Sequence, residues 1–370
     1  MSNFIQLHLL TCFPPSNLNR DDLGRPKTAM FGGTQRLRVS SQCLKRSARL
    51  APEMEAAVGN GLGTRTLIFG EHLREQLAAH GANPETATKI AENISDRLSP
   101  LEKDRKKHGL KSKVITFYSA EEIRRSIALG AKLVSENRTE PTEAEIASLS
   151  SDVVPDADVA LFGRMIADKT SAMSETEGAA SVAHAITVHP VAIESDAFTA
   201  VDDLQNRAEN AGAAHLSDAG FAAGVFYTWA SIDWDLLVHN LRGDAAFASQ
   251  AVKGFVGAML ASGPGSKKRA YGSITRPRFV MVERGQETDN LCSAFLKGIT
   301  DDDILEAAGD RLEAYAQTLS ENYDRKFDRM TFRATQSGSP KLPELVEFAA
   351  QPFPKTAGTQ DPSVNAGAPE

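Results

Sequence analysis

Hydrophobic residues alternate with polar ones and then cluster near the start of the chain, which predicts a strand over residues 4–10. The same kind of pattern, rich in β-branched and aromatic residues, recurs later in the chain. It predicts further strands over residues 178–190, 224–232 and 279–282. Strands therefore lie near both ends of the chain.

Between and after these strands, apolar residues recur at helical spacing. The predicted helices span 41–50, 65–80, 84–98, 119–135, 142–150, 244–261, 289–298, 301–319 and 342–350. Residues 11–39 and 190–221, with their many turn-forming or small residues, are predicted as loops, and 351–370 as a disordered tail. This order of elements predicts an α+β sheet domain interrupted by a large helical insertion.

Composition places the chain among globular proteins. Of its 370 residues, 41% are hydrophobic and 24% charged, and no apolar run reaches the roughly 20 residues that cross a bilayer. The N-terminus lacks the features of a signal peptide, and the three cysteines offer neither a disulfide framework nor a CxxC metal pair. We therefore expect a cytoplasmic protein with no membrane contact and no metal or cofactor.

Charge is distributed unevenly along the chain. The net charge is −7, yet the segment from Leu23 to Pro52 holds seven bases and no acid. Such a block within an acidic protein is typical of a surface that binds a polyanion. A solvated basic face that pairs with acids elsewhere in the fold is an equally good interpretation of the charge alone.

The helix predicted at 41–50 carries bases on one face. The polar positions at i, i+3, i+4 and i+7 are Gln42, Lys45, Arg46 and Arg49. Ser40 and Ser41 precede this helix, where free backbone N–H groups and the helix dipole favour an anion. With no acid nearby in the sequence, phosphate binding is favoured over an ordinary amphipathic helix with a charged exterior.

Three other segments carry candidate chemistry, each with a plainer alternative. Glu102–Lys113 holds six bases and is either a basic finger for nucleic acid or a solvated loop. Gly263–Arg269 ends in three bases but lacks the spacing of a nucleotide-binding P-loop, so an exposed turn is the alternative. Asp21 and Asp22 could act as a general base or metal ligand, although a structural role in a loop is favoured.

Several motifs, in order and spacing, resemble one family. They are Asn17–Asp22 (NLNRDD), Phe31–Gly33 (FGG), Arg36–Arg46 (RLRVSSQCLKR), Gly163–Met165 (GRM), Ala180–Thr187 (ASVAHAIT), Phe198–Leu204 (FTAVDDL) and Gly224–Tyr227 (GVFY). Together they are similar to the CasC family, the CRISPR RNA-binding backbone subunit of the type I-E CRISPR surveillance complex, Cascade. The regions 52–160 and beyond about 300 match poorly.

The resemblance implies an α+β fold shaped like a hand. Its palm would be a modified RRM-like (ferredoxin-like) sheet, formed by residues 1–58, 179–189 and 222–350. A large helical insertion, 59–178, would form the fingers, and a β-hairpin at 190–221 the thumb. The aromatic signature of an RRM is absent from the sequence, so the residues alone do not predict that fold.

The resemblance also implies a non-enzymatic scaffold. Several copies would stack head to tail along one CRISPR RNA, hold its backbone and displace nucleotides at regular intervals. The remaining bases would pair with target DNA, so that base pairing reads the sequence. The partners would be the CRISPR RNA, target DNA, other copies of the chain, and the large, small, 5′-end and 3′-end capping subunits of Cascade.

The resemblance and the basic helix together nominate the RNA-binding residues. Backbone contacts are expected from Arg20, Lys27, Arg38, Ser40, Gln42, Lys45, Arg46, Arg49, Lys267 and Arg269. Met165 would wedge against bases near the displaced nucleotide, and Phe198 and Thr199 would pack beside the kink. Nonspecific contacts with target DNA are expected from Lys103, Lys106, Lys107, Lys111 and Lys113.

The main alternative is an enzyme. Backbone subunits of type III CRISPR complexes share the fold and cleave target RNA with an aspartate in the loop after the first strand. Asp21 or Asp22 could take that role here. The type I-E motifs argue against it, because that class leaves cutting to a recruited nuclease.

Overall fold

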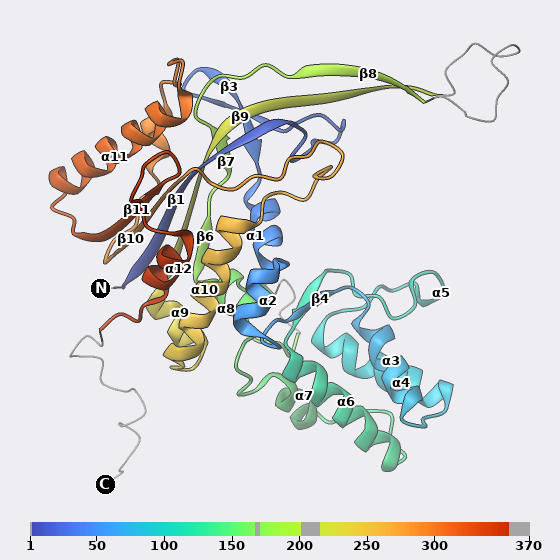
Figure 1. Ribbon diagram of the computed structural model, residues 1–370. Coiled ribbons are helices and arrows are strands. Elements are labelled where there is room, and N and C mark those ends of the chain that lie inside the picture. Colours follow the sequence, from blue (N-terminus) through green and yellow to red (C-terminus); the bar gives the residue numbers. More distant parts are fainter. Residues whose placement is uncertain (1, 167–170, 201–214, 355–370) are drawn as a thin grey trace, which may run out of the picture.

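The computed structural model describes residues 2–166, 171–200 and 215–354 (Figure 1). Its strands are β1 (Phe4–Ser16), β2 (Thr28–Phe31), β3 (Thr34–Val39), β4 (Thr64–Thr66), β5 (Thr116–Tyr118), β6 (Ala180–Val182), β7 (Ala185–Thr187), β8 (Glu194–Ala200), β9 (His215–Asp233), β10 (Phe279–Gly285) and β11 (Phe327–Arg333). Nine of these described strands form one antiparallel sheet in the order β11-β10-β1-β9-β7-β3-β2, with β6 and β8 also paired to β9. The remaining two, β4 and β5, pair with each other.

The helices lie on both faces of the sheet and beyond it. They are α1 (Ser41–Arg49), α2 (Pro52–Val58), α3 (Phe69–Ala79), α4 (Pro84–Leu98), α5 (Arg105–His108), α6 (Ala120–Ser135), α7 (Glu143–Ser150), α8 (Ala157–Phe162), α9 (Trp234–Asn240), α10 (Ala245–Ala261), the 3₁₀ helix η1 (Leu291–Phe295), α11 (Ile304–Asn322) and α12 (Leu342–Ala350). The predicted α+β class is confirmed by this mixture of antiparallel sheet and helices.

Strand β1 lies at the centre of the sheet because alternate residues can be buried on both faces. Leu7 and Leu9 join the core shared with α1, α2, α10 and α12, whereas Leu10 joins the core under α11 and η1. The strand predicted at 4–10 is confirmed and continues to Ser16. Its neighbours are β9 on one side and β10 on the other.

A second group of helices has a hydrophobic core of its own. We call the segment from β4 through α7 the helical part; its α3, α4, α6 and α7 enclose buried residues such as Leu73, Ile94 and Leu133. Figure 1 shows this part set apart from the sheet, at the lower right. The helices predicted at 84–98, 119–135 and 142–150 are confirmed, each with a side-chain cap, from Asn83, Ser119 and Thr142.

The prediction of a loop over 11–39 is wrong for part of that segment. Strands β2 and β3 form a hairpin whose turn is Gly32-Gly33, with φ of 60° and 76°. A Cβ atom on Gly32 would lie 1.7 Å from the carbonyl oxygen of Leu296, so only glycine fits there. The glycines and prolines around the hairpin concealed it, because the strands are short.

The prediction of a loop over 190–221 is also wrong. Strand β8 pairs with the first part of β9 in a hairpin that extends away from the sheet (Figure 1). Phe198 and Thr199 lie in β8, paired with Ser217 and Leu216. The hairpin is the element that the family resemblance implied as a thumb. Residues 201–214 lie outside the described residues, as does most of the predicted disordered tail, 355–370.

Other boundaries differ from the predictions. The helix predicted at 65–80 begins at Phe69, after β4, and the strand predicted at 178–190 is divided into β6 and β7. The helix predicted at 289–298 is the short 3₁₀ helix η1. Helices α2, α5, α8 and α9 and strands β4, β5 and β11 do not correspond to any predicted element. No helix in the described part of the chain is long and apolar enough to span a membrane.

Candidate nucleic-acid interface

Helix α1 is held against the sheet by its apolar side. Leu44 and Ala48 are buried in the core, and the side chain of Ser40 accepts a hydrogen bond from the Cys43 amide at 3.3 Å. A side-chain oxygen at this cap position satisfies a donor that the first helical turn leaves unpaired. The predicted helix and its cap are therefore confirmed.

Other protein groups occupy most of the amides at the start of α1. The Ser40 amide donates to Oδ1 of Asn19 at 2.9 Å, and the Ser41 amide donates to Nδ1 of His184 at 2.9 Å. The Cys43 amide is taken by Ser40 itself. The expectation that these N–H groups are free for a phosphate is wrong for these three. A phosphate near α1 must rely on side chains instead.

The basic face of α1 is divided between solvent and protein. Gln42 and Arg46 are exposed, but Lys45 is half-buried. Its Nζ donates to the Ala180 carbonyl at 3.2 Å and lies 5.8 Å from the centre of the Phe162 ring. Burial lowers the pKa of Lys45. Its contact with RNA stays a prediction, and in the free chain the amine is bonded to β6.

Arg49 joins α1 to α8 and to β5 of the helical part. Its Nε lies 2.6 Å from Oδ2 of Asp158, which is fully buried, and Nη2 donates to the Gly63 carbonyl at 2.8 Å. The guanidinium also stacks on Phe117 at 5.0 Å. The expectation that no acid lies near the basic face is therefore wrong at Arg49. The contact of Arg49 with RNA stays a prediction. In this structure its side chain is only 14% exposed.

Three predicted segments meet around one groove. The loop after β1 supplies Arg20, Asp21 and Asp22, α1 supplies Cys43, and the glycine-rich loop supplies Ser266. The groove has a volume of about 470 Å³. Segments separated by more than 200 residues in the sequence are thus brought to one place, next to the exposed side of α1.

Asp21 is committed to its own loop. Its Oδ1 accepts hydrogen bonds from the amides of Leu23 and Arg25, both at 2.9 Å. Such a turn is a common structural use of aspartate. Within residues 2–166, 171–200 and 215–354, no group of three or more His, Cys, Asp or Glu side chains is arranged to hold a metal ion.

Lys27 and Arg38 lie beside the start of α1. The Lys27 amide bonds the Asn19 carbonyl, and the Arg38 amide bonds the Lys27 carbonyl, both at 2.8 Å. These backbone bonds fix both residues while their side chains stay partly exposed. Together with burial, their positive charges lower the pKa of His184. Burial raises the pKa of Cys43, which lines the groove, and the nearby charges of Lys27 and Arg46 oppose that rise. Basic side chains therefore lie close to the groove, which Arg20 itself lines.

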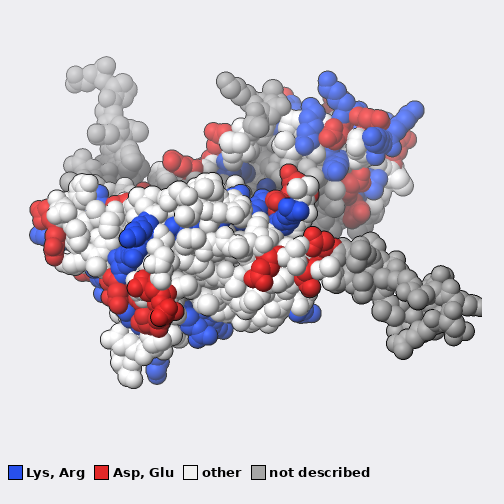
Figure 2. All heavy atoms as spheres, turned by 90° about the horizontal axis from the view of Figure 1, so that it is seen from above, with Lys and Arg blue, Asp and Glu red and all other residues white. Residues whose placement is uncertain are grey.

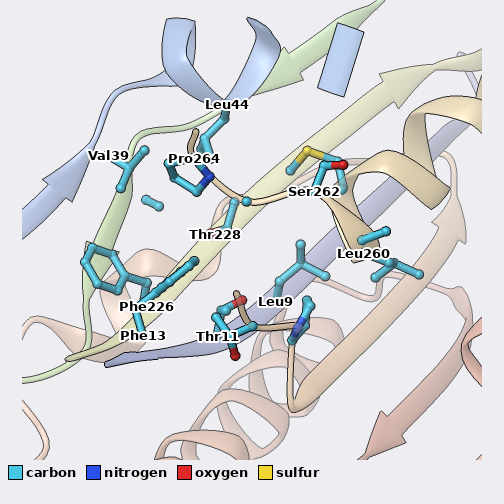
Figure 3. Close-up of a pocket in the computed structure, with 16 residues that line it drawn as sticks. Leu9, Thr11, Phe13, Val39, Leu44, Phe226, Thr228, Leu260, Ser262 and Pro264 are labelled. Atoms are coloured by element: carbon cyan, nitrogen blue, oxygen red, sulfur yellow. The ribbon is translucent and has the colours of Figure 1, made fainter. Parts of the chain in front are cut away.

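Lys267 and Arg269 are exposed in the turn that follows α10. Lys267 has φ of 46°, and its amine lies 5.6 Å from the Tyr271 ring. Pro264, earlier in this loop, lines an apolar pocket with Leu9, Leu44 and Phe226 (Figure 3). That pocket has a volume of about 30 Å³, which suits one or two water molecules rather than a nucleobase. Its size therefore argues against a base-binding site.

Met165 is exposed to solvent, and the residue before it, Arg164, is buried. Its side chain is 86% exposed, whereas Arg164 is 6% exposed. Nη1 of Arg164 lies 2.7 Å from Oε2 of Glu122, at the start of α6, and Nε donates to the Ser174 carbonyl at 2.9 Å. The ion pair fixes the backbone next to Met165, and the wedge role of Met165 stays a prediction.

The basic run in the helical part is mostly exposed. Lys103, Lys106, Lys107 and Lys113 lie in or near α5, with Lys111 half-buried. On the face seen in Figure 2, blue and red side chains are interspersed and no continuous basic surface is visible. Contacts of these lysines with DNA stay predictions.

Similarity to known proteins covers nearly the whole chain. The family model described as CT1975-like protein matches residues 5–351. The chain belongs to the CT1975-like family.

Two solved structures are similar to this CT1975-like protein over 94% of its length and 99% of theirs. A chain of the structure titled "CRISPR RNA-guided surveillance complex, pre-nicking" is 30% identical, with a TM-score of 0.81. A chain of another, titled "CRISPR RNA-guided surveillance complex", is 26% identical, with a TM-score of 0.71. No curated protein matches the chain.

Sequence reasoning missed three residues that shape this interface in the CT1975-like protein. Asn19 and His184 accept hydrogen bonds from the start of α1, and Arg164 supports Met165. Each lies inside a family motif, but nothing local to the sequence shows which group it contacts. His184 falls within the strand predicted at 178–190, and the structure places it between β6 and β7.

Proposed function

We propose that the chain is the CRISPR RNA-binding backbone subunit of a type I-E surveillance complex in the cytoplasm. Several copies stack head to tail along the RNA, and other subunits of the complex end the stack. The observation that carries the proposal is the match to a chain of an RNA-guided surveillance complex at a TM-score of 0.81 over 94% of the chain. Membership of the CT1975-like family supports it.

The surface chemistry agrees with a grip on an RNA backbone. Arg20 and Arg46 are exposed, and neither has an ion-pair partner among the described residues. Arg20 lines the groove formed by the loop after β1, α1 and the glycine-rich loop, and Arg46 lies near Cys43, which lines it too. Cationic side chains without base-specific partners hold phosphates and leave the bases free. Such a surface binds any spacer sequence, as a guide-holding scaffold must.

In this proposal the chain is a scaffold and cuts nothing. The Met165 wedge and the β8–β9 hairpin displace nucleotides at regular intervals, and the intervening bases pair with target DNA. The exposed lysines around α5 hold the DNA by charge alone. The hydrogen bonds that Asp21 accepts from its own loop support a structural role for this carboxylate over a catalytic one.

The proposal is tested by producing the chain with the other subunits of the complex and a CRISPR array, then extracting bound nucleic acid. We expect RNA of one uniform length from the wild type and less from an Arg20→Ala/Arg46→Ala variant. The matched control is Arg242→Ala/Lys253→Ala, which removes the same charge from α10 and the turn before it, away from the groove.

Salt dependence is the second measurement. The logarithm of the affinity should fall with the logarithm of salt concentration, with a slope of roughly −0.7 for each phosphate neutralised. The Arg20→Ala/Arg46→Ala variant should have a shallower slope than the control. An assembled wild-type complex without RNA would overturn the proposal. So would metal-dependent cleavage of complementary RNA that disappears in Asp21→Ala or Asp22→Ala, because it would mark the chain as a type III-like nuclease.

A further inference from the structure

His184 is held in one tautomer by the protein. It lies between β6 and β7, and its Nδ1 is 2.9 Å from the Ser41 amide nitrogen at the start of α1. A backbone N–H can only donate, so Nδ1 must be the acceptor and carry no proton. A neutral imidazole then has its hydrogen on Nε2. The geometry thus fixes Nε2–H as a donor.

The ring lies near two basic side chains, and its Nε2 has no hydrogen-bond partner among residues 2–166, 171–200 and 215–354. His184 is exposed. Burial of part of the ring and the charges of Arg38 and Lys27 lower its pKa, which favours the neutral imidazole. A neutral donor beside two cations is suited to an oxygen acceptor on an anionic ligand.

We propose that His184 binds the RNA backbone through Nε2–H, donating to a phosphate oxygen or to the ribose 2′-oxygen. The inference rests on the proposed function, because it takes RNA as the ligand of this surface. Lys27 and Arg38 attract the anion by charge, whereas His184 adds a hydrogen bond of fixed direction. The Ser41 amide holds the ring so that this direction is set before RNA arrives.

Two conservative variants separate binding from support of α1. In His184→Asn the side-chain oxygen can take the place of Nδ1 and accept from the Ser41 amide, but nothing replaces Nε2–H. In His184→Gln the longer amide can place a donor near the position of Nε2. If His184 only supports α1, the asparagine variant should bind RNA as the wild type does.

The test uses the full-length chain, a labelled single-stranded RNA and a DNA of the same sequence, over a series of salt concentrations. One lost neutral hydrogen bond should weaken RNA binding by roughly three- to tenfold in His184→Asn, with a similar thermal midpoint. The salt slope should stay that of the wild type, because no charge is removed. Lys27→Ala/Arg38→Ala is the matched control. It should make the dependence of affinity on salt shallower, because it removes two positive charges. His184→Gln should recover part of the affinity.

The DNA arm identifies the acceptor. An equal loss on RNA and DNA assigns the bond to a phosphate oxygen, and a loss on RNA alone assigns it to the 2′-oxygen; both support the inference. Wild-type affinity in His184→Asn would overturn the role of His184 and leave the proposed function intact. A wild-type chain that fails to bind RNA, alone or in the assembled complex, would overturn both.

Discussion

Where a basic side chain points decides what it can bind. Arg36 belongs to the acid-free segment between Leu23 and Pro52, yet it is 0% exposed. Its guanidinium donates to the carbonyls of Thr187 at 3.0 Å and Phe295 at 3.1 Å, and so ties β3 to β7 and η1. Carbonyl acceptors satisfy its donors without a carboxylate. Part of the positive charge in this segment therefore serves the fold and is not available to a ligand.

Arg49 gives a test of this distinction. Arg49→Ala should lower the free energy of unfolding by about 3 kcal/mol, because it leaves the fully buried Asp158 without its ion-pair partner. Arg46→Ala, one turn earlier and exposed, should change it by less than about 0.5 kcal/mol. Urea denaturation followed by circular dichroism measures both. Equal stability of the two variants would contradict the structural role of Arg49.

At the scale of elements, short loops set the positions of the larger parts. The side-chain amide of Asn17 donates to the carbonyls of Gly24 at 2.9 Å and Gly220 at 3.0 Å. It thereby joins the loop that lines the groove to the base of the β8–β9 hairpin. Two residues later, Asn19 accepts from Ser40. One turn of chain after β1 thus connects the groove, the hairpin and the start of α1.

Asn17→Ala should weaken RNA binding by more than its loss of stability alone would explain. The matched control is Asn240→Ala, since Asn240 also donates from one amide to two carbonyls, those of Ala160 and Glu177. Each variant should lose about 1–3 kcal/mol of stability. Only Asn17→Ala should reduce affinity for single-stranded RNA, measured by fluorescence anisotropy. Comparable affinity in both variants would show that the loop does not position the interface.

A half-buried carboxyl between α6 and α8 makes stability depend on pH. Asp156 accepts from the Ala120 amide at 2.9 Å, and burial, with the charges of Asp158 and Glu122, raises its pKa to about 6. The folded state therefore holds this proton more tightly than the unfolded chain, where the pKa is about 4. The stability that the protonated form contributes is complete below pH 4 and is lost as pH rises through 6.

Asp156→Asn should remove that dependence, because the amide stays neutral and its oxygen can still accept from Ala120. At pH 7 the variant should be more stable than the wild type by about 1 kcal/mol, a value reduced for screening at this half-buried group. Below pH 4 the two should coincide. Denaturation curves at pH 4, 5.5 and 7 measure the difference, and a gap that grows toward acid pH would contradict the assignment.

At the scale of the whole molecule, the helical part is attached to the sheet but does not share its core. Its buried residues form a separate cluster, and Arg49 of α1 reaches across by stacking on Phe117 of β5. Proteins with separate cores can open one while the other stays folded. Leu133→Ala, at a fully buried position of α6, should therefore speed amide exchange in α3, α4 and α6, and leave β1, β9 and β10 protected.

Hydrogen exchange followed by mass spectrometry shows whether the helical part opens independently of the sheet or together with it. The control is Leu7→Ala, an equally large deletion in β1, which should expose the sheet. If Leu133→Ala instead raised exchange evenly over both parts, the two cores would be one cooperative unit.

How far the sequence predicts this protein depends on the range of the interaction. Helices α4, α6 and α7 could be predicted because their apolar residues recur at helical spacing. Each also begins with a cap whose side chain accepts from the amide three residues later. Strand β11 was missed because its charged residues suggest a surface loop, whereas Arg329 lies against Glu283 of β10. Arg49 was placed on a free basic face because its acid, Asp158, is 109 residues away. Periodicity reports local structure, and only the folded chain shows such distant partners.

Strand β9 runs for 19 residues without interruption, from the β8–β9 hairpin to the centre of the sheet. At about 3.3 Å per residue, the strand is about 60 Å long. Inside the sheet it pairs with β1, and the regular register of this pairing is interrupted between Phe13 and Ser16 of β1. Because β9 is one continuous strand, the hairpin and the centre of the sheet share a single backbone, and a change in the register of β9 against β1 would also move the base of the hairpin.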